Sequence, residues 1–75
     1  MIEDSKVRDS RIFVYSCIKD GGVQTLEKLL EEKDKAIKSG KLWNIQDADI
    51  EKAIDSMINY WKSIVRLPDG SITIT

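Results

Sequence analysis

The sequence of 75 residues lacks histidine, contains one cysteine and one proline, and has no apolar run long enough to span a bilayer. Without histidine, serine and cysteine triads of the usual kind lack their base, and the commonest zinc ligand is missing. A lone Cys17 can form neither an intramolecular disulfide nor a thiolate metal site. We therefore expect a protein without enzyme chemistry or cofactor, in a reducing intracellular compartment and not in a membrane.

The sequence also lacks an excess of charge of either sign: it has 12 basic and 13 acidic residues, and its net charge is −1. Such a balance provides no overall field that would attract nucleic acid or an anionic membrane. The hydrophobic content of 41% is typical of a soluble globular protein, and 75 residues leave room for one small core. We expect a single domain over residues 1–75 that is monomeric in isolation.

The first helix is predicted over about residues 5–19, behind Asp4 and Ser5, which are both good N-cap types. The segment Ile12 to Tyr15 is rich in strand-forming residues, so a short strand there is the alternative. The pair Gly21-Gly22 lacks the spacing and the following lysine of a phosphate-binding loop, and we interpret it as the end of the helix. The predicted buried face comprises Val7, Val14 and Ile18, with Tyr15 beside it.

A second helix is predicted to begin after the cap residue Thr25 and to end at Ser39-Gly40. Its outer face is charged, and the spacing of Glu31 and Lys35 predicts an ion pair between successive turns. The connector over residues 41–46 is expected to pack its apolar side chains against the core, with an aromatic binding platform as the alternative. The predicted buried residues are Leu26, Leu29, Leu30 and Ile37 in the helix, and Trp43 and Ile45 in the connector.

The third helix has the clearest periodicity and is predicted to extend to Trp61. Asp47 is predicted as its N-cap, and Asp49 and Glu51 suit the positive end of its dipole. A step of about 100° per residue separates a buried stripe from a far side that is available to a partner. The stripe comprises Ile50, Ala53, Ile54, Met57, Ile58 and Trp61, and the far side comprises Lys52, Asp55, Ser56 and Asn59, with Glu51 and Lys62 at its margin.

From Ile64 the apolar period changes from helical to alternating, and the alternation resumes from Ile72 to Thr75. Between these segments, Pro68-Asp69-Gly70 predicts a tight turn, since proline presets φ and glycine supplies a positive φ. Two strands alone are marginal and must pack on the helices, and Val23 is a candidate for a third, edge strand. The predicted fold is α+β, a winged helix-turn-helix of three helices with a C-terminal β-hairpin wing.

A winged helix can bind DNA with the start of its third helix, but here that segment is acidic. Carboxylates at this position would repel phosphates, and the wing offers only Arg66 against Asp69. A protein-interaction module is therefore favoured, and a small DNA-binding regulator of transcription or replication is the alternative. The acidic residues are Asp47, Asp49 and Glu51, whereas the basic residues Lys33, Lys35, Lys38 and Lys41 cluster late in the second helix.

Four segments of the chain resemble a known domain: residues 11–18, 25–30, 50–61 and 66–72. Their pattern of apolar positions is similar to that of the carboxy-terminal winged-helix domain of cullins, most closely that of the cullin-like scaffold subunit of the anaphase-promoting complex. The resemblance covers nearly the whole chain and implies the C-terminal fragment of a larger scaffold protein.

This resemblance implies a non-catalytic part of a multisubunit RING ubiquitin ligase that acts in cell-cycle control, in the nucleus and the cytoplasm. The domain would help to position the ubiquitin-conjugating enzyme beside the RING subunit, next to other scaffold subunits. In ordinary cullins a lysine of this domain accepts a ubiquitin-like modifier, and Ile18 occupies the matching position here. Lys19 is one residue further, a turn of about 100° around a helix, so the resemblance does not carry the modification over.

The surface predicted to contact the partner consists of the exposed side of the third helix and the wing. This choice rests on the exposure that helical periodicity predicts. A further hypothesis, in which the domain only packs within its parent chain, predicts an apolar patch on the surface of the isolated chain. The predicted partner-binding residues are Glu51, Lys52, Asp55, Asn59, Lys62, Arg66 and Asp69.

Overall fold

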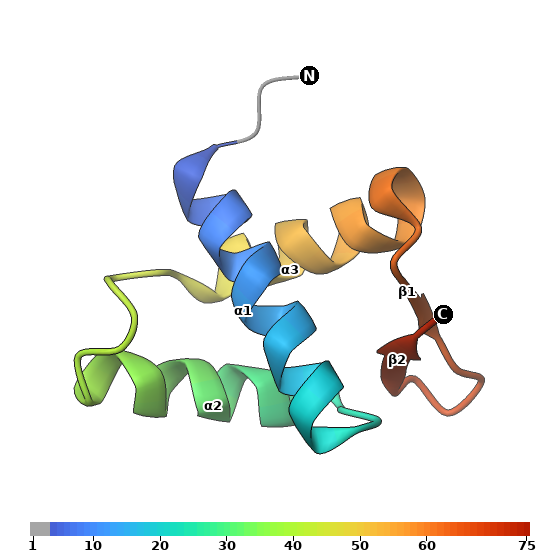
Figure 1. Ribbon diagram of the computed structural model, residues 1–75, viewed down its shortest axis with the longest axis horizontal. Helices are drawn as coiled ribbons and strands as arrows, with labels where there is room; N and C mark the ends of the chain where they lie inside the picture. Colours follow the sequence, from blue (N-terminus) through green and yellow to red (C-terminus); the bar gives the residue numbers. More distant parts are fainter. Residues whose placement is uncertain (1–3) are drawn as a thin grey trace.

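The structure is a computed structural model that describes residues 4–75, and it shows an α+β fold of three helices and a two-stranded antiparallel hairpin (Figure 1). In Figure 1, α1 runs across α3, α2 lies below them, and the hairpin stands at the right. The elements agree with the predicted fold class and are compatible with a winged helix. They are α1 (Ser5–Gly21), α2 (Leu26–Lys38), α3 (Asp47–Ser56), the π-helical turn η1 (Met57–Trp61), β1 (Ile64–Arg66) and β2 (Ile72–Ile74).

Helix α1 begins and ends with local hydrogen bonds that its sequence supplies. The Asp4 carboxylate accepts from the backbone N–H of Lys6 at 2.8 Å, as an N-cap should. At the other end Gly22 takes a φ of 79°, and its N–H donates to the carbonyl of Ile18 at 2.8 Å. The helix therefore reaches Gly21, two residues beyond the predicted end, and the alternative strand within it is wrong.

Helix α2 begins after the predicted cap residue Thr25 and ends at the predicted position, before Ser39. The Thr25 hydroxyl accepts from the N–H of Lys28 at 3.1 Å, and the chain leaves the helix through Gly40 with a φ of 78°. The predicted pair of Glu31 with Lys35 is wrong, because Lys35 lies 3.6 Å from Glu32 instead. The same Glu32 carboxylate lies 3.3 Å from the ammonium of Lys28, so one acid serves two lysines.

Helix α3 differs from the prediction at its start. Gln46, not Asp47, is the N-cap residue, and its backbone N–H donates to the Asp49 carboxylate at 2.9 Å. Asp47 is the first helical residue, and its carboxylate binds the ammonium of Lys33 on α2. The cap prediction failed because a partner remote in the sequence engages the Asp47 side chain.

The end of α3 also differs from the prediction, since the helix widens into the π-helical turn η1 after Ser56. Lys62 closes this turn in the left-handed conformation, with a φ of 57°, and its N–H donates to the carbonyl of Met57. A π-turn places more residues in each turn and so rotates Trp61 away from the buried stripe. Trp61 is 48% exposed, and its predicted burial is wrong.

The hairpin has the predicted turn, and its strands pair in an antiparallel register. Ile64 pairs with Ile74 and Arg66 with Ile72, and Gly70 takes a φ of 92° in the turn between the strands. The predicted third strand is reduced to one antiparallel bridge, between Gln24 and Ile72, with N···O distances of 2.9 and 2.7 Å. This bridge ties the connection between α1 and α2 to the hairpin.

The core lies where α1, α2 and α3 meet the hairpin. Ile45 is buried in it as predicted, but Trp43 of the same connector is 48% exposed. Its indole N–H donates to the Asp9 carboxylate at 2.6 Å, and the Lys6 ammonium lies 5.6 Å from the ring centroid. The indole therefore lies over the surface of α1 and keeps its N–H satisfied. The buried core residues are Val14, Ile18, Leu29, Ile45, Ile50, Ile54, Met57, Ile64 and Ile72.

Lys33 is a buried charge that connects α2 to α3. The residue is only 6% exposed, and its ammonium binds the carboxylates of Asp47 and of Asp34, the latter at 3.1 Å. The hydrogen bond to Asp47 raises the pKa of Lys33 above the ordinary value of 10.5, against the opposing effect of burial. The resulting stabilisation is present at neutral pH and is lost as the pH rises through the raised pKa.

None of the helices within residues 4–75 is long and apolar enough to cross a lipid bilayer.

Replacing Asp47 tests the link between α2 and α3. Asp47→Ala is expected to lower the free energy of unfolding by about 1–2 kcal/mol, because it leaves a buried ammonium with Asp34 alone. Lys33→Met keeps the apolar stem and removes the charge, so its loss is expected to be smaller. Urea denaturation at neutral pH, followed by circular dichroism, measures both. An Asp47→Ala variant as stable as the unmodified chain would contradict this link.

Candidate protein-interaction surface

The exposed side of α3 carries four of the predicted partner-binding residues. Glu51, Lys52 and Asp55 are exposed on α3, and Asn59 is exposed on η1. The four-residue spacing of Glu51, Asp55 and Asn59 brings them to one side of the helix. Among residues 4–75, the three charged side chains have no ion-pair partner. They face solvent without internal compensation, so a partner could pair with them.

The other three predicted residues follow along the chain. Lys62 is exposed after η1 and Arg66 is exposed in β1, and neither has an ion-pair partner among the described residues. Asp69 is exposed at the turn, but its carboxylate accepts hydrogen bonds from the N–H and the hydroxyl of Ser71, at 2.9 and 2.5 Å. Its first role is therefore to hold the turn of the hairpin.

The predicted residues are spread over α3, η1 and the hairpin, and none of them lines either of the two hollows described below. They run from the first turns of α3, along η1, and over to the tip of the hairpin, which stands beyond the end of η1 in Figure 1. Glu51 lies in the first half of α3, which is about 15 Å long at 1.5 Å per residue, whereas Asp69 lies in the turn of the hairpin. A partner would need a broad surface to contact both residues.

The start of α3 remains acidic in the folded chain. Asp47 is held by Lys33, and Asp49 is held by the N–H of Gln46, so both carboxylates have partners inside the domain. Glu51 is then the first acid of α3 that lies free toward solvent in the described part of the chain. A phosphate backbone approaching this end of the helix would meet uncompensated negative charge.

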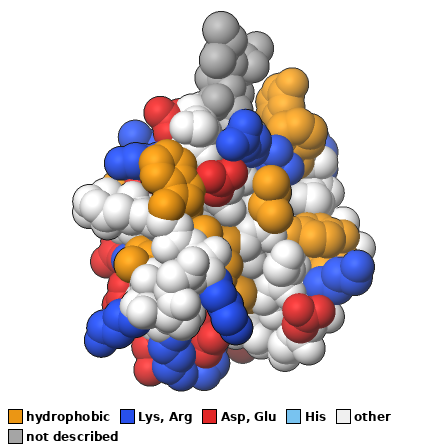
Figure 2. All heavy atoms as spheres, turned by 60° about the vertical axis from the view of Figure 1, so that its left-hand side comes forward, with side chains coloured by type: hydrophobic (Ala, Val, Ile, Leu, Met, Phe, Trp, Pro, Cys, Tyr) orange, Lys and Arg blue, Asp and Glu red, His pale blue; other side chains and the backbone are white. Residues whose placement is uncertain are grey.

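The outer face of α2 carries both signs of charge. Figure 2 shows basic and acidic side chains interleaved over the lower part of the molecule, where α2 lies in Figure 1. Lys28 and Lys35 both approach Glu32, whose single carboxylate offsets part of their combined charge. In the cluster of lysines predicted late in this helix, Lys33 and Lys35 are paired with acids, whereas Lys38 and Lys41 are exposed and form no ion pair among the described residues.

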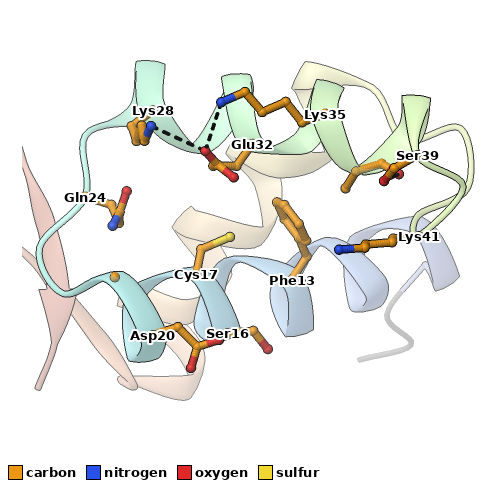
Figure 3. Close-up of a pocket in the computed structure, with 12 residues that line it drawn as sticks. Phe13, Ser16, Cys17, Asp20, Gln24, Lys28, Glu32, Lys35, Ser39 and Lys41 are labelled. Atoms are coloured by element: carbon orange, nitrogen blue, oxygen red, sulfur yellow. Dashed lines mark hydrogen bonds and ion pairs between the residues drawn. The ribbon is translucent and has the colours of Figure 1, made fainter.

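A groove of about 720 Å³ lies between α1 and α2 (Figure 3). Phe13 and Cys17 of α1 point into it, and Glu32 enters from α2 between Lys28 and Lys35. Burial raises the pKa of the Cys17 thiol above its ordinary value, and the charges of Glu32 and Asp20 raise it further. The thiol is therefore protonated at neutral pH and is a poor nucleophile.

The pKa of the Glu32 carboxyl in this groove is shifted in the opposite direction. The hydrogen bond from Lys28 lowers the pKa of Glu32, and the charge of Lys35 lowers it further. Glu32 is thus ionised at neutral pH and cannot serve as a general acid there. Within residues 4–75, no group of three or more metal-ligating side chains could hold a metal ion. The arrangement suits packing or binding better than acid–base chemistry.

A second surface feature, which sequence reasoning missed, is an exposed group that we call the aromatic patch: Ile12 and Tyr15 of α1 with Tyr60 and Trp61 of η1. Tyr60 packs at 81° to Trp61 with centroids 5.2 Å apart, and the Arg11 guanidinium lies 4.4 Å from the Trp61 ring centroid. The available signal was the Tyr60-Trp61 pair, because two large aromatic residues about 100° apart at the end of a helix are hard to bury together. An exposed apolar patch is also what the packing hypothesis predicts.

The chain matches no known protein family, and no curated protein or solved structure gives a significant match. The fold and its surfaces therefore define its class: a small α+β domain of three helices and a hairpin, with one charged face and one aromatic patch.

Substituting Asp69 tests its role in the turn through the dependence of stability on pH. The hydrogen bonds from Ser71 lower the pKa of Asp69 below its ordinary value of 3.8. The stabilisation is fully present above that value and is lost as the pH falls through the lower pKa of the folded state. Asp69→Ala is thus expected to be less stable than the unmodified chain at neutral pH, with the difference shrinking in strong acid. Thermal melts over this range measure it.

Asp69→Asn provides the matched control, because its amide oxygen can still accept from Ser71 but does not titrate. It should retain part of the stability at neutral pH. A difference between Asp69→Ala and the unmodified chain that stays constant from neutral to strongly acidic pH would refute the role of the ionised carboxylate.

Proposed function

We propose that this chain is a non-catalytic winged-helix domain that binds protein partners within a multisubunit RING ubiquitin ligase. It acts as the end of a larger cullin-like scaffold, similar to the scaffold subunit of the anaphase-promoting complex. There it helps to position the ubiquitin-conjugating enzyme beside the RING subunit during cell-cycle control in the nucleus and the cytoplasm. In this role the domain would supply binding surfaces and leave the catalysis to other subunits.

The order of the elements supports the winged-helix assignment. A winged helix places a short strand between its first two helices and closes with a hairpin after the third. Here the bridge of Gln24 with Ile72 follows α1 at the position of that strand, and β1 and β2 follow α3. The eight residues 39–46 connect α2 to α3, a longer connection than the three- or four-residue turn of a typical helix-turn-helix.

The charge on the exposed side of α3 is the observation that favours binding to a protein over binding to DNA. Glu51 and Asp55 alternate with Lys52 and are uncompensated within the described chain, whereas the basic residues of α2 are largely paired with acids. DNA-binding helices depend on basic contacts to phosphate for most of their affinity. Mixed charge on an exposed helix instead suits specific steering of a protein partner.

Reversing both acids on α3 tests this surface. Glu51→Lys with Asp55→Lys is expected to weaken binding to a ubiquitin-conjugating enzyme by about tenfold or more, because two attractive charges become repulsive. Folding should be unaffected, since both residues are exposed. The isotope-labelled chain is titrated with a panel of purified conjugating enzymes, and amide shifts on α3 and the hairpin report the contact.

The matched control is the double reversal of Glu27 and Glu31, which are exposed on α2 and should leave binding unchanged. If no enzyme in the panel shifts the amide signals of α3, the proposed partner is wrong. If both double variants bind the conjugating enzyme equally well, the assigned surface is wrong. A salt-sensitive complex of the unmodified chain with duplex DNA at low salt would instead support the DNA-binding alternative.

A further inference from the structure

We propose that the aromatic patch is a second docking site, which binds an acidic amphipathic segment of a partner protein. None of its four residues belongs to the face assigned above to the conjugating enzyme, and Lys62 of that face follows Trp61 directly in the chain. The site is a hollow of about 370 Å³ between α1 and η1, within the range of about 300–1,000 Å³ that is common for binding pockets. Ile12, Tyr15 and Trp61 line it together with Met57, which belongs to the core.

The patch is held in place before any partner arrives. The Arg11 guanidinium covers one face of the Trp61 ring, and Tyr60 packs against the same ring nearly at a right angle. Ile12 projects from a helix whose opposite side, at Val14, is fully buried. Rigid aromatic and aliphatic anchors of this kind lose little entropy on binding, and apolar side chains of a partner can enter the hollow at low cost.

Among the described residues, Arg11 is the one charged side chain that lines the hollow. Two exposed lysines are close to its lining residues along the chain: Lys19 lies one helical turn beyond Tyr15 on α1, and Lys62 follows Trp61 directly. The side chains that line the hollow include no Asp or Glu within the described chain. Lys19 and Lys62 form no ion pair among residues 4–75. An occupant with carboxylates on either side of its apolar anchors is therefore the complementary one.

Two other occupants fit the surface less well. A second copy of the chain would bring the same basic side chains together around the hollow, which costs energy through repulsion of like charges. Single-stranded nucleic acid would need open aromatic faces for base stacking, but Arg11 and Tyr60 already occupy the Trp61 ring. The acidic peptide uses both the apolar hollow and its basic surroundings.

A synthetic peptide tests the proposal with the chain alone, so the result does not depend on any ligase. The probe is an amphipathic helix of about four turns, with leucines on one side and glutamates beside them. It is titrated against the isotope-labelled chain, and amide shifts in α1 and η1 are expected. The same peptide with lysine in place of each glutamate is expected to bind at least about tenfold more weakly.

Two pairs of variants localise the binding. Ile12→Glu and Trp61→Ala are each expected to lower the affinity for the acidic peptide by about tenfold or more, since each removes an apolar anchor. Val23→Glu and Trp43→Ala are the matched controls, because Val23 is 54% exposed like Ile12, and Trp43 is 48% exposed like Trp61, yet neither lines the hollow. Thermal melts show that each variant is folded before its affinity is compared.

The proposal is overturned if the acidic peptide does not bind, or if Ile12→Glu and Val23→Glu bind it equally. Equal affinity for the lysine peptide overturns it as well, because the basic surroundings then have no role. A thymidine oligonucleotide that binds in place of the peptide, or self-association that Ile12→Glu abolishes, would assign the patch to a different occupant and also overturn it.

Discussion

The packing of two isoleucines from the hairpin against the helices is the constraint on which the rest of the structure depends. A hairpin of two three-residue strands is marginal in water, and it persists here because Ile64 and Ile72 are buried among the core residues of α1, α2 and α3. The bridge of Gln24 with Ile72 adds a second attachment, to the connection that precedes α2. Docking the hairpin in this way fixes the direction in which the chain must leave α3.

The shape of the surface follows from that exit. To place Ile64 in the core directly after α3, the chain widens into η1 and reverses at the left-handed Lys62. This change of period turns Trp61 outward beside Tyr15 of α1 and creates the aromatic patch. The π-helical turn η1 thus separates two surfaces. One is the charged side along α3, suited to steering a partner, and the other is the apolar hollow with basic residues nearby, suited to anchoring one.

Much of the predicted partner surface followed from periodicity alone. Glu51, Asp55 and Asn59 are exposed as predicted, because a residue's place on a helix depends mainly on its spacing from the buried stripe. The contact of Asp69 with Ser71 is local, because an aspartate in a turn commonly accepts from the N–H two residues on, and the sequence analysis missed it. The aromatic patch could not be predicted, because it depends on how η1 meets α1, and spacing within a single element does not encode that.

The sequence by itself determined the local features of this protein: the Thr25 cap, the exit at Gly40, and the turn at Gly70, since each depends on neighbours within a few residues. Only the tertiary structure decided which polar and aromatic side chains would be covered. Lys33 is buried because Asp47 of another helix binds its ammonium, and Trp43 stays at the surface because Asp9 of α1 holds its indole N–H. In each case the partner is far away along the chain, so the outcome required the packing of one element against another.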